Sequence, residues 1–244
     1  MEIEFIKNKV YYKIIDKTYT NSSGIYSLHK YNDAVKLAQV QQNIDNIKTE
    51  FDANELFILN QVHGNAVVLA DNMDLKKQPE ADASVTTQKK IALAVLTADC
   101  IPVLFASDDG AVIGAAHCGW RSAKSNIITN VRKMMQDKAA KKIKAIIGPA
   151  IAQKSYEVDV NYYHDFISED DDIKELFLPS SIDNHFMFDL VGFVKKKLQK
   201  ENIELVHNVS EDTYSMPEKY PSYRRSFHEG TQYSQNILST IIIR

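Results

Sequence analysis

Short apolar runs dominate this chain, and polar residues, glycine or proline separate them. Apolar and polar positions alternate over Ile3–Ile15, which predicts a hairpin that turns at Lys7 and Asn8. Unbroken apolar runs of about four to eight residues predict buried strands, and the turn residues Gly148 and Pro149 stop one of these runs. The predicted strands are Leu56–Leu59, Ala66–Ala70, Ile91–Thr97, Val103–Ala106, Ala111–Ala116, Ile143–Ile151 and Ile237–Arg244.

Helical periodicity occurs in three segments. Asn32 or Asp33 precedes the first segment and Asp189 lies at the start of the third, where an N-cap residue is expected. A short apolar run at Ile203–His207 follows the third segment and predicts one more strand. The predicted helices are Asp33–Thr49, a segment from Arg121 or Ser122 to about Lys138, and Phe188–Leu198.

The order of these elements favours one domain of the α+β class. No internal repeat, low-complexity linker or Pro/Gly-rich hinge divides the 244 residues, so we expect a single domain over residues 1–244. Hydrophobic residues make up 44% of the chain, which is enough for a sizeable core. The strands do not alternate regularly with helices, and this argues for α+β layers rather than a βαβ repeat.

Composition also limits the partners and the compartment that we expect. The formal net charge of −3 gives no electrostatic reason for a nucleic-acid partner. No apolar run approaches the ~20 residues of a membrane span, and the N-terminal segment lacks the unbroken apolar region of a signal peptide. Two cysteines are too few for a disulfide framework, so we expect a cytoplasmic protein with free thiols. The sequence leaves the oligomeric state open.

Three residues capable of binding metal stand at the ends of apolar runs. His63 precedes Gly64, Cys100 precedes Ile101 and Pro102, and His117 ends the run before Gly119. Side chains at strand ends can converge on one point while the sheet holds them rigid. Two imidazoles and one thiolate match a zinc site with three protein ligands and one open position, the arrangement of catalytic zinc.

Each of these residues also has a structural interpretation. A single histidine at a strand end is often a satisfied core residue, and a buried cysteine is often a small apolar side chain. The spacing between Cys100 and His117 fits no short zinc motif. Cys118 alternates away from His117 on the predicted strand, so we expect it to pack in the core.

Asp99 is the least expected residue in its apolar surroundings. A carboxylate there costs several kcal/mol unless it is paired. A salt bridge or a cap on backbone amides would satisfy it. The functional alternatives are that Asp99 orients a ligand histidine or transfers a proton.

At these residues the chain resembles the YfiH/YlmD family, also described as laccase-domain or multicopper polyphenol oxidase-like proteins. The matching motifs occur in the family's order and span most of the chain. They are QVHG at Gln61–Gly64, ADASVTT at Ala81–Thr87, TADCIPVLF at Thr97–Phe105, AAHCGWRS at Ala115–Ser122, IGPAI at Ile147–Ile151, YEV at Tyr156–Val158 and SYRR at Ser222–Arg225.

The resemblance implies a fold, a metal and an activity. The fold is a layered α/β/β/α sandwich with mixed sheets, and the metal is zinc bound by His63, Cys100 and His117. The implied activity is phosphorolysis of adenosine, inosine, guanosine or methylthioadenosine, together with deamination of adenosine. The implied partners are therefore a purine nucleoside and phosphate.

Several positions depart from the family's pattern. SLHKY at Ser27–Tyr31 replaces a usual SLNLG, and Cys118 and Ser122 replace an alanine and a glycine. The usual Asn-Arg pair of the first helix is Asn43-Ile44, and a closing arginine is absent at Gln232. The three metal-binding residues are retained, whereas two candidate anion-binding arginines are not, so the departures bear on phosphate affinity more than on metal binding.

Phosphate requires guanidinium groups or backbone amides. The candidates are Arg121, Arg224 and Arg225, and the resemblance adds Asn43 as a substrate-binding residue. The alternative for each arginine is an ordinary surface position. For the chemistry itself, we expect Cys100, His117 and Asp99 to act as catalytic residues.

The sequence also allows activities other than that of a purine nucleoside enzyme. A copper oxidase with several ions needs many histidines, usually in His-x-His pairs, and none of the seven histidines forms such a pair. One copper ion could still bind the three residues in place of zinc. Cys100 with His117 as its base would instead suit an amidohydrolase that edits peptidoglycan precursors. The last alternative is a metal-stabilised binding module without catalysis.

Overall fold

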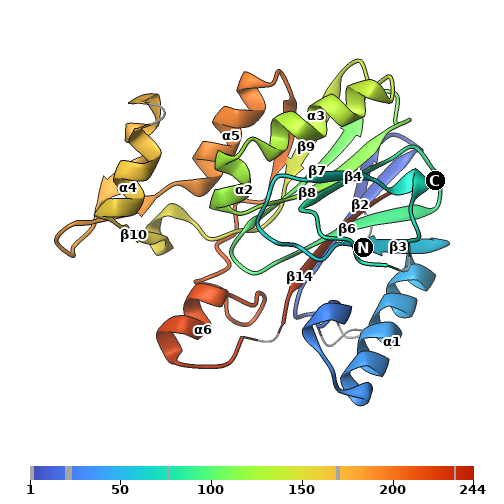
Figure 1. Cartoon of the computed structure of the whole chain (residues 1–244), viewed down its shortest axis with the longest axis horizontal. Helices are drawn as coiled ribbons and strands as arrows, with labels where there is room; N and C mark the ends of the chain where they lie inside the picture. The colour runs from blue at the N-terminus through green and yellow to red at the C-terminus, as the bar shows by residue number, and fades with distance from the viewer. Residues whose placement is uncertain (1–2, 20–23, 76, 169–170, 234) are drawn as a thin grey trace.

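The computed structural model describes residues 3–19, 24–75, 77–168, 171–233 and 235–244. Two mixed β-sheets form the centre of the molecule, and a small third sheet lies beside them. Six α-helices and four short 3₁₀ helices (η) connect or cover these sheets in the described residues. Figure 1 shows α1 on one side of the paired sheets and α3 and α5 on the other.

The first sheet has five strands and contains both the N-terminal hairpin and the last strand of the chain. The predicted hairpin forms, with Asn8 in the left-handed region at its turn. The last strand pairs on both sides, which confirms the prediction that it lies in the interior. The strand order is β1 (Ile3–Ile6), β2 (Val10–Ile15), β14 (Ile237–Ile243), β6 (Ile91–Thr97) and β3 (Glu55–Ile58).

The second sheet has six strands, and its central strands come from the most apolar runs of the sequence. Both outer pairs are parallel and the central ladders are antiparallel. The order is β13 (Glu204–Asn208), β9 (Ile143–Ile147), β7 (Ile101–Ser107), β8 (Ile113–Cys118), β5 (Ala83–Thr86) and β4 (Val67–Leu69).

Three apolar clusters hold the layers together. One cluster lies between the two large sheets and joins residues such as Leu93 and Ile241 to Leu104 and Ala115. A second cluster packs α1 (Ala34–Glu50) on the outer face of the five-stranded sheet. The third packs α3 (Ile127–Asp137) and α5 (Leu190–Lys200) on the outer face of the six-stranded sheet. This arrangement confirms the expected α/β/β/α sandwich.

The helices begin where their cap residues predicted. Asp33 caps α1 by accepting a hydrogen bond from the amide of Val35, and Asp189 caps α5 by accepting one from Gly192. The helix predicted from Arg121 or Ser122 to Lys138 is, however, two helices. Asn126 adopts the left-handed region with φ of 67°, which breaks the segment into α2 (Trp120–Lys124) and α3.

The small sheet was not predicted from the sequence pattern. It consists of β10 (Glu157–Asp159), β12 (His185–Phe188) and β11 (Phe177–Pro179), and α4 (Val160–Ile167) follows β10. Its strands are short, and stacked aromatic pairs at Tyr162–Phe166 and Phe177–Phe188 pack it into the core cluster beneath α5. Such short strands depend on tertiary packing, which a local pattern does not encode.

In the described residues, the remaining elements are one short α-helix and four 3₁₀ helices. The short helix α6 (Tyr223–Glu229) carries the SYRR motif. The 3₁₀ helices are η1 (Leu28–Lys30), η2 (Ala70–Asn72), η3 (Gln153–Ser155) and η4 (Asp171–Leu176). Among the residues that the structure describes, every helix is too short or too polar to cross a membrane.

Candidate active site

The site lies where the chain passes from one large sheet to the other. The segment from β3 to β4 crosses between the sheets and carries His63, and the turn from β6 to β7 crosses again and carries Cys100. His117 lies on β8, where it pairs with Pro102 two residues beyond Cys100. Both crossings and β8 therefore end at the same edge of the sandwich, and this brings three distant residues together.

The three predicted metal ligands meet in the structure. One side-chain donor atom from each of His63, Cys100 and His117 lies within 4.8 Å of the others. The two imidazole rings pack edge to face, with centroids 4.7 Å apart. His117 is buried, Cys100 is half-buried and His63 is exposed, so one side of the cluster faces outward. This geometry suits an ion with three protein ligands and an open position.

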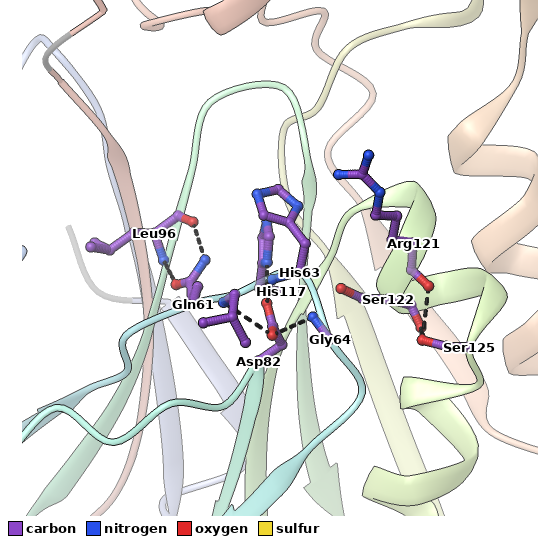
Figure 2. Close-up of polar contacts among 10 residues, drawn as sticks. Gln61, His63, Gly64, Asp82, Leu96, His117, Arg121, Ser122 and Ser125 are labelled. Atoms are coloured by element: carbon purple, nitrogen blue, oxygen red, sulfur yellow. Dashed lines mark hydrogen bonds and ion pairs between the residues drawn. The ribbon is translucent and has the colours of Figure 1, made fainter.

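Asp82 positions both histidines, and sequence analysis did not single it out. Its Oδ1 accepts a hydrogen bond from His117 Nδ1 at 2.8 Å, which leaves the Nε2 of that ring available as a metal ligand. The same carboxylate accepts the backbone amides of Val62, His63 and Gly64 (Figure 2). Asp82 has no exposed surface. The only available sequence signal for this role was the presence of an aspartate in the matched ADASVTT motif.

The charged forms of Cys100 and His117 stabilise each other. Burial raises the pKa of Cys100, but the neighbouring His117 and His63 outweigh it and lower that pKa to about 6. Burial lowers the pKa of His117, but the Cys100 charge and Asp82 outweigh it and raise that pKa. Without metal, the cluster therefore favours a thiolate beside an imidazolium. Burial raises the pKa of Cys118, which packs in the core as predicted.

Gly119 leaves space for the cluster. A Cβ atom at this position would lie 3.0 Å from His63 Nδ1 and 3.1 Å from Cys100 Sγ. The backbone of Gly119 has φ of −69°, which any residue adopts, so the need for glycine is steric rather than conformational. The missing side chain and the N₂S donor set are both consistent with a resident transition-metal ion.

The carboxylate of Asp99 has a structural role. It accepts hydrogen bonds from Thr213 Oγ1 at 2.7 Å, Ser222 Oγ at 2.9 Å and the backbone amide of Arg224 at 2.7 Å. These contacts dock the start of α6 against the β6–β7 turn, and Asp99 itself has φ of 92°. The amide-capping alternative is therefore the one observed, and Asp82 rather than Asp99 orients His117. The three donors also leave Asp99 poorly placed to transfer a proton.

A cavity of about 520 Å³ opens beside the cluster. Its volume lies within the roughly 300–1,000 Å³ range of small-molecule sites. The lining combines the three cluster residues with aromatic rings and cations. The lining side chains with these properties are His63, Cys100, His117, Trp120, Tyr156, Tyr223, Tyr233, Lys30, Arg121 and Arg224.

Two of the predicted phosphate ligands reach the cavity. The Arg121 guanidinium lies over the Trp120 ring, 4.7 Å from its centroid, and it extends away from α2 in Figure 2. The Arg224 guanidinium lies 5.1 Å from the centroid of Tyr156 and donates one hydrogen bond to the carbonyl of Glu157. Both cations are therefore held against aromatic faces at the cavity wall.

The structure does not bring the other two predicted substrate residues to the cavity. The Arg225 guanidinium donates to the carbonyls of Thr213, Tyr214 and Tyr220, so it ties together the loop before α6. Asn43 is buried in α1 and donates to the carbonyl of Ile25. Sequence analysis proposed both as substrate-binding residues, but their observed side-chain hydrogen bonds are to backbone carbonyls.

The two positions at which this chain lacks a family arginine, Ile44 and Gln232, have different surroundings. Ile44 packs between α1 and the five-stranded sheet, so the absence of an arginine there removes no cation from the cavity beside Cys100. Gln232 directly precedes Tyr233, which lines that cavity. Lys30 also lines this cavity, and sequence analysis did not select it. The available signal was the departure of SLHKY from the family's SLNLG.

Gln61 fixes the start of the crossing that carries His63. Its side-chain amide donates to the carbonyl of Leu96 and accepts the Leu96 amide, both at 2.7 Å (Figure 2). The side chain therefore continues the parallel pairing of β3 with β6 after the main chain of β3 has ended. This link and Asp82 together determine where the His63 loop lies.

Comparisons with known proteins show the family and the fold of this chain. A family model described as "Multi-copper polyphenol oxidoreductase laccase" matches residues 15–239. A Rickettsia conorii protein named purine nucleoside phosphorylase RC0672 is 49% identical over 239 residues, which cover 98% of each chain.

Solved structures show the same fold. The crystal structure of Neisseria meningitidis protein NMB0706 superposes with a TM-score of 0.83 at 26% identity, over 100% of this chain and 98% of that one. The Bacillus licheniformis protein YfiH gives a TM-score of 0.81 at 21% identity, over 96% of this chain and 93% of that one. The resemblance to the YfiH/YlmD family is thus confirmed.

Replacing Asp82 tests its role in the cluster. In Asp82→Asn, a side-chain NH₂ replaces one acceptor oxygen and faces N–H groups that also donate hydrogen bonds. We therefore expect metal affinity to fall by about 10- to 100-fold. Metal titration with a competing chelator measures this change. Asp212→Asn is the matched control, because Asp212 is also buried and bonded to backbone amides but does not contact the cluster. Equal metal affinity in both variants would contradict the assignment.

Replacing Gly119 tests the steric requirement. We expect Gly119→Ala to fold normally but to lose bound metal, since its Cβ would displace His63 or Cys100. Gly230→Ala provides the converse control. Gly230 has φ of +65° and open space around it, so this substitution should cost about 1 kcal/mol of stability and leave metal content unchanged. Full metal content in Gly119→Ala would refute the steric argument.

The lowered pKa of Cys100 predicts its reactivity. Since the thiolate persists down to about pH 6, we expect iodoacetamide to modify Cys100 in metal-free protein with a midpoint near that pH. Cys118 should stay unmodified in the folded chain because it is fully buried. Mass spectrometry of the labelled peptides measures both rates, and added metal should protect Cys100. A midpoint near the ordinary value of 9.0 would contradict the predicted pairing.

Proposed function

We propose that this chain, which belongs to the multi-copper polyphenol oxidoreductase laccase family, is a purine nucleoside phosphorylase that uses one bound zinc ion. The observation that carries the proposal is the convergence of His63, Cys100 and His117 at the wall of a cavity that also presents Arg121 and Arg224. The name of the Rickettsia conorii relative supports the same activity.

The donor set supports a single ion rather than a multinuclear copper centre. Among the described residues, His63, Cys100 and His117 form the only group of three or more His, Cys, Asp or Glu side chains close enough to hold a metal. A zinc ion there would supply a Lewis acid and would lower the pKa of a bound water towards neutrality. One copper ion could bind the same donors, but a laccase needs several ions.

The protein's own residues would then bind and orient the two substrates. In phosphorolysis the C1′–N9 bond breaks with its electron pair passing to the purine, and a phosphate oxygen forms the new bond to C1′. Arg121 and Arg224 would hold the phosphate through charge-assisted hydrogen bonds. Asp99 acts as a positioning residue, because it binds the backbone amide of Arg224 and so fixes that side chain at the cavity.

The aromatic side chains suit the nucleoside. Trp120, Tyr156, Tyr223 and Tyr233 line the cavity and offer apolar faces to a purine ring. Burial raises the pKa of Tyr156 to about 12, so its hydroxyl stays protonated and can donate a hydrogen bond to the departing base. We extend the proposal to adenosine, inosine, guanosine and methylthioadenosine as substrates, and to deamination of adenosine at the same site.

One observation favours a second candidate. The low pKa of Cys100 beside His117 is also what a cysteine amidohydrolase requires. A thiolate that binds metal is a poor nucleophile, so metal content separates the two activities. Protein purified without added metal should contain about one zinc per chain under the first proposal and none under the second.

The activity assay combines nucleosides, phosphate and a metal-site variant. We expect wild-type protein with inosine and phosphate to release hypoxanthine and ribose 1-phosphate, measured by liquid chromatography. His63→Ala should lose most bound zinc and more than about 90% of this activity without unfolding, because His63 is exposed and its loop remains bound to Asp82.

Two controls complete the assay. His185→Ala serves as the matched variant, because His185 lies on β12 outside the cavity and should keep both zinc and activity. With phosphate present, adenosine should yield adenine. Without phosphate, adenosine should yield inosine by deamination. Absence of base release at every phosphate concentration would refute the phosphorylase proposal, and full zinc content in His63→Ala would refute the ligand assignment.

A further inference from the structure

We propose that Lys30 binds the anionic substrate of this cavity and thereby determines its affinity for inorganic phosphate. This inference rests on the proposed phosphorylase function, and it adds a residue that neither the motifs nor the comparisons select. Lys30 ends the 3₁₀ helix η1 and lines the same cavity as Cys100, Arg121 and Arg224.

The Lys30 ammonium is held in place by an aromatic ring. Its Nζ lies 4.3 Å from the ring centroid of Tyr233, which also lines the cavity. The ring is itself anchored, since its hydroxyl accepts a hydrogen bond from Asn236 and its face meets Tyr223 edge to face at 5.7 Å. A cation–π contact positions an ammonium without neutralising its charge, so Lys30 keeps its hydrogen-bonding capacity for a ligand.

The cavity has an excess of positive charge. In the described part of the chain, no carboxylate forms an ion pair with Lys30 or Arg121, and the Arg224 guanidinium donates only to a backbone carbonyl. Asp99 is the one acidic side chain in the lining, and its oxygens already accept hydrogen bonds from Thr213, Ser222 and the Arg224 amide. Three cations thus face one carboxylate that is already engaged, and an anion is the ligand that balances them.

Partial desolvation of the Lys30 ammonium agrees with this interpretation, although the residue as a whole is exposed. Desolvation lowers the pKa of Lys30, which is the direction expected for an ammonium without a nearby negative charge. A bound phosphate would supply that charge. Lysine also differs from the two arginines of the cavity, because its ammonium is a compact point charge on a flexible stem that can follow a phosphate as it moves towards the sugar.

Substitution of Lys30 tests the inference in three variants. Lys30→Met keeps the stem and removes the charge, and Lys30→Arg keeps the charge. Lys36→Met is the matched control, because Lys36 also lies over a tyrosine ring, that of Tyr31 at 5.3 Å, but does not line the cavity. Two quantities are measured on the zinc-loaded protein: the KM for phosphate with inosine as nucleoside, and the Kd for inorganic phosphate by isothermal titration calorimetry.

We expect Lys30→Met to raise both constants by about tenfold, the effect of losing one charge-assisted hydrogen bond in a partly solvated site. The KM for inosine and the melting temperature should change little, which a merely structural role would not explain. Lys30→Arg should restore most of the phosphate affinity, and Lys36→Met should match the wild type. The difference between wild type and Lys30→Met should shrink as salt is raised.

The two measurements separate this inference from the proposed function. Unchanged phosphate KM and Kd in Lys30→Met would overturn the role of Lys30 while leaving the phosphorylase proposal intact. Phosphate binding that depends on Lys30, in a protein that releases no base, would support the anion site and refute the phosphorylase proposal. Wild-type protein that does not bind phosphate at all would overturn the inference.

Discussion

The buried carboxylate of Asp82 is the interaction on which the site depends. It binds the ring of His117 on β8 and three consecutive amides of the loop that carries His63, so a single side chain positions two of the three candidate metal ligands. A carboxylate without exposed surface costs several kcal/mol unless its oxygens are satisfied. Folding therefore satisfies Asp82 and assembles the cluster in the same step.

The connections between the sheets explain why the candidate active site forms at this edge. Two crossings from the five-stranded to the six-stranded sheet place His63 and Cys100 outside the ladders, while β6 and β7, on either side of Cys100, are buried throughout. Residues in such turns need not pack in the core, and both His63 and Asp99 adopt the left-handed backbone region there. The rigid sandwich supports irregular backbone at the site, and a cavity forms beside it.

Sequence analysis was most accurate where one local property decided the outcome. Strong apolar runs predicted β6, β7 and β14, and the caps Asp33 and Asp189 predicted the starts of α1 and α5. It was less accurate where distant groups compete for the same atoms. Arg225 has the composition of a phosphate ligand, but three carbonyls of a neighbouring loop bind its guanidinium. Asp99 likewise binds α6, more than a hundred residues later in the chain.

The sequence by itself determined the apolar pattern of the two large sheets, the identity of three candidate metal ligands and the family that they resemble. Only the tertiary structure decided which carboxylate orients His117, which arginines reach the cavity, and that Lys30 lies there with them. The physical reason is that periodicity and capping are local properties of the chain. The satisfaction of a buried charge depends on partners that only the folded chain brings within hydrogen-bonding distance.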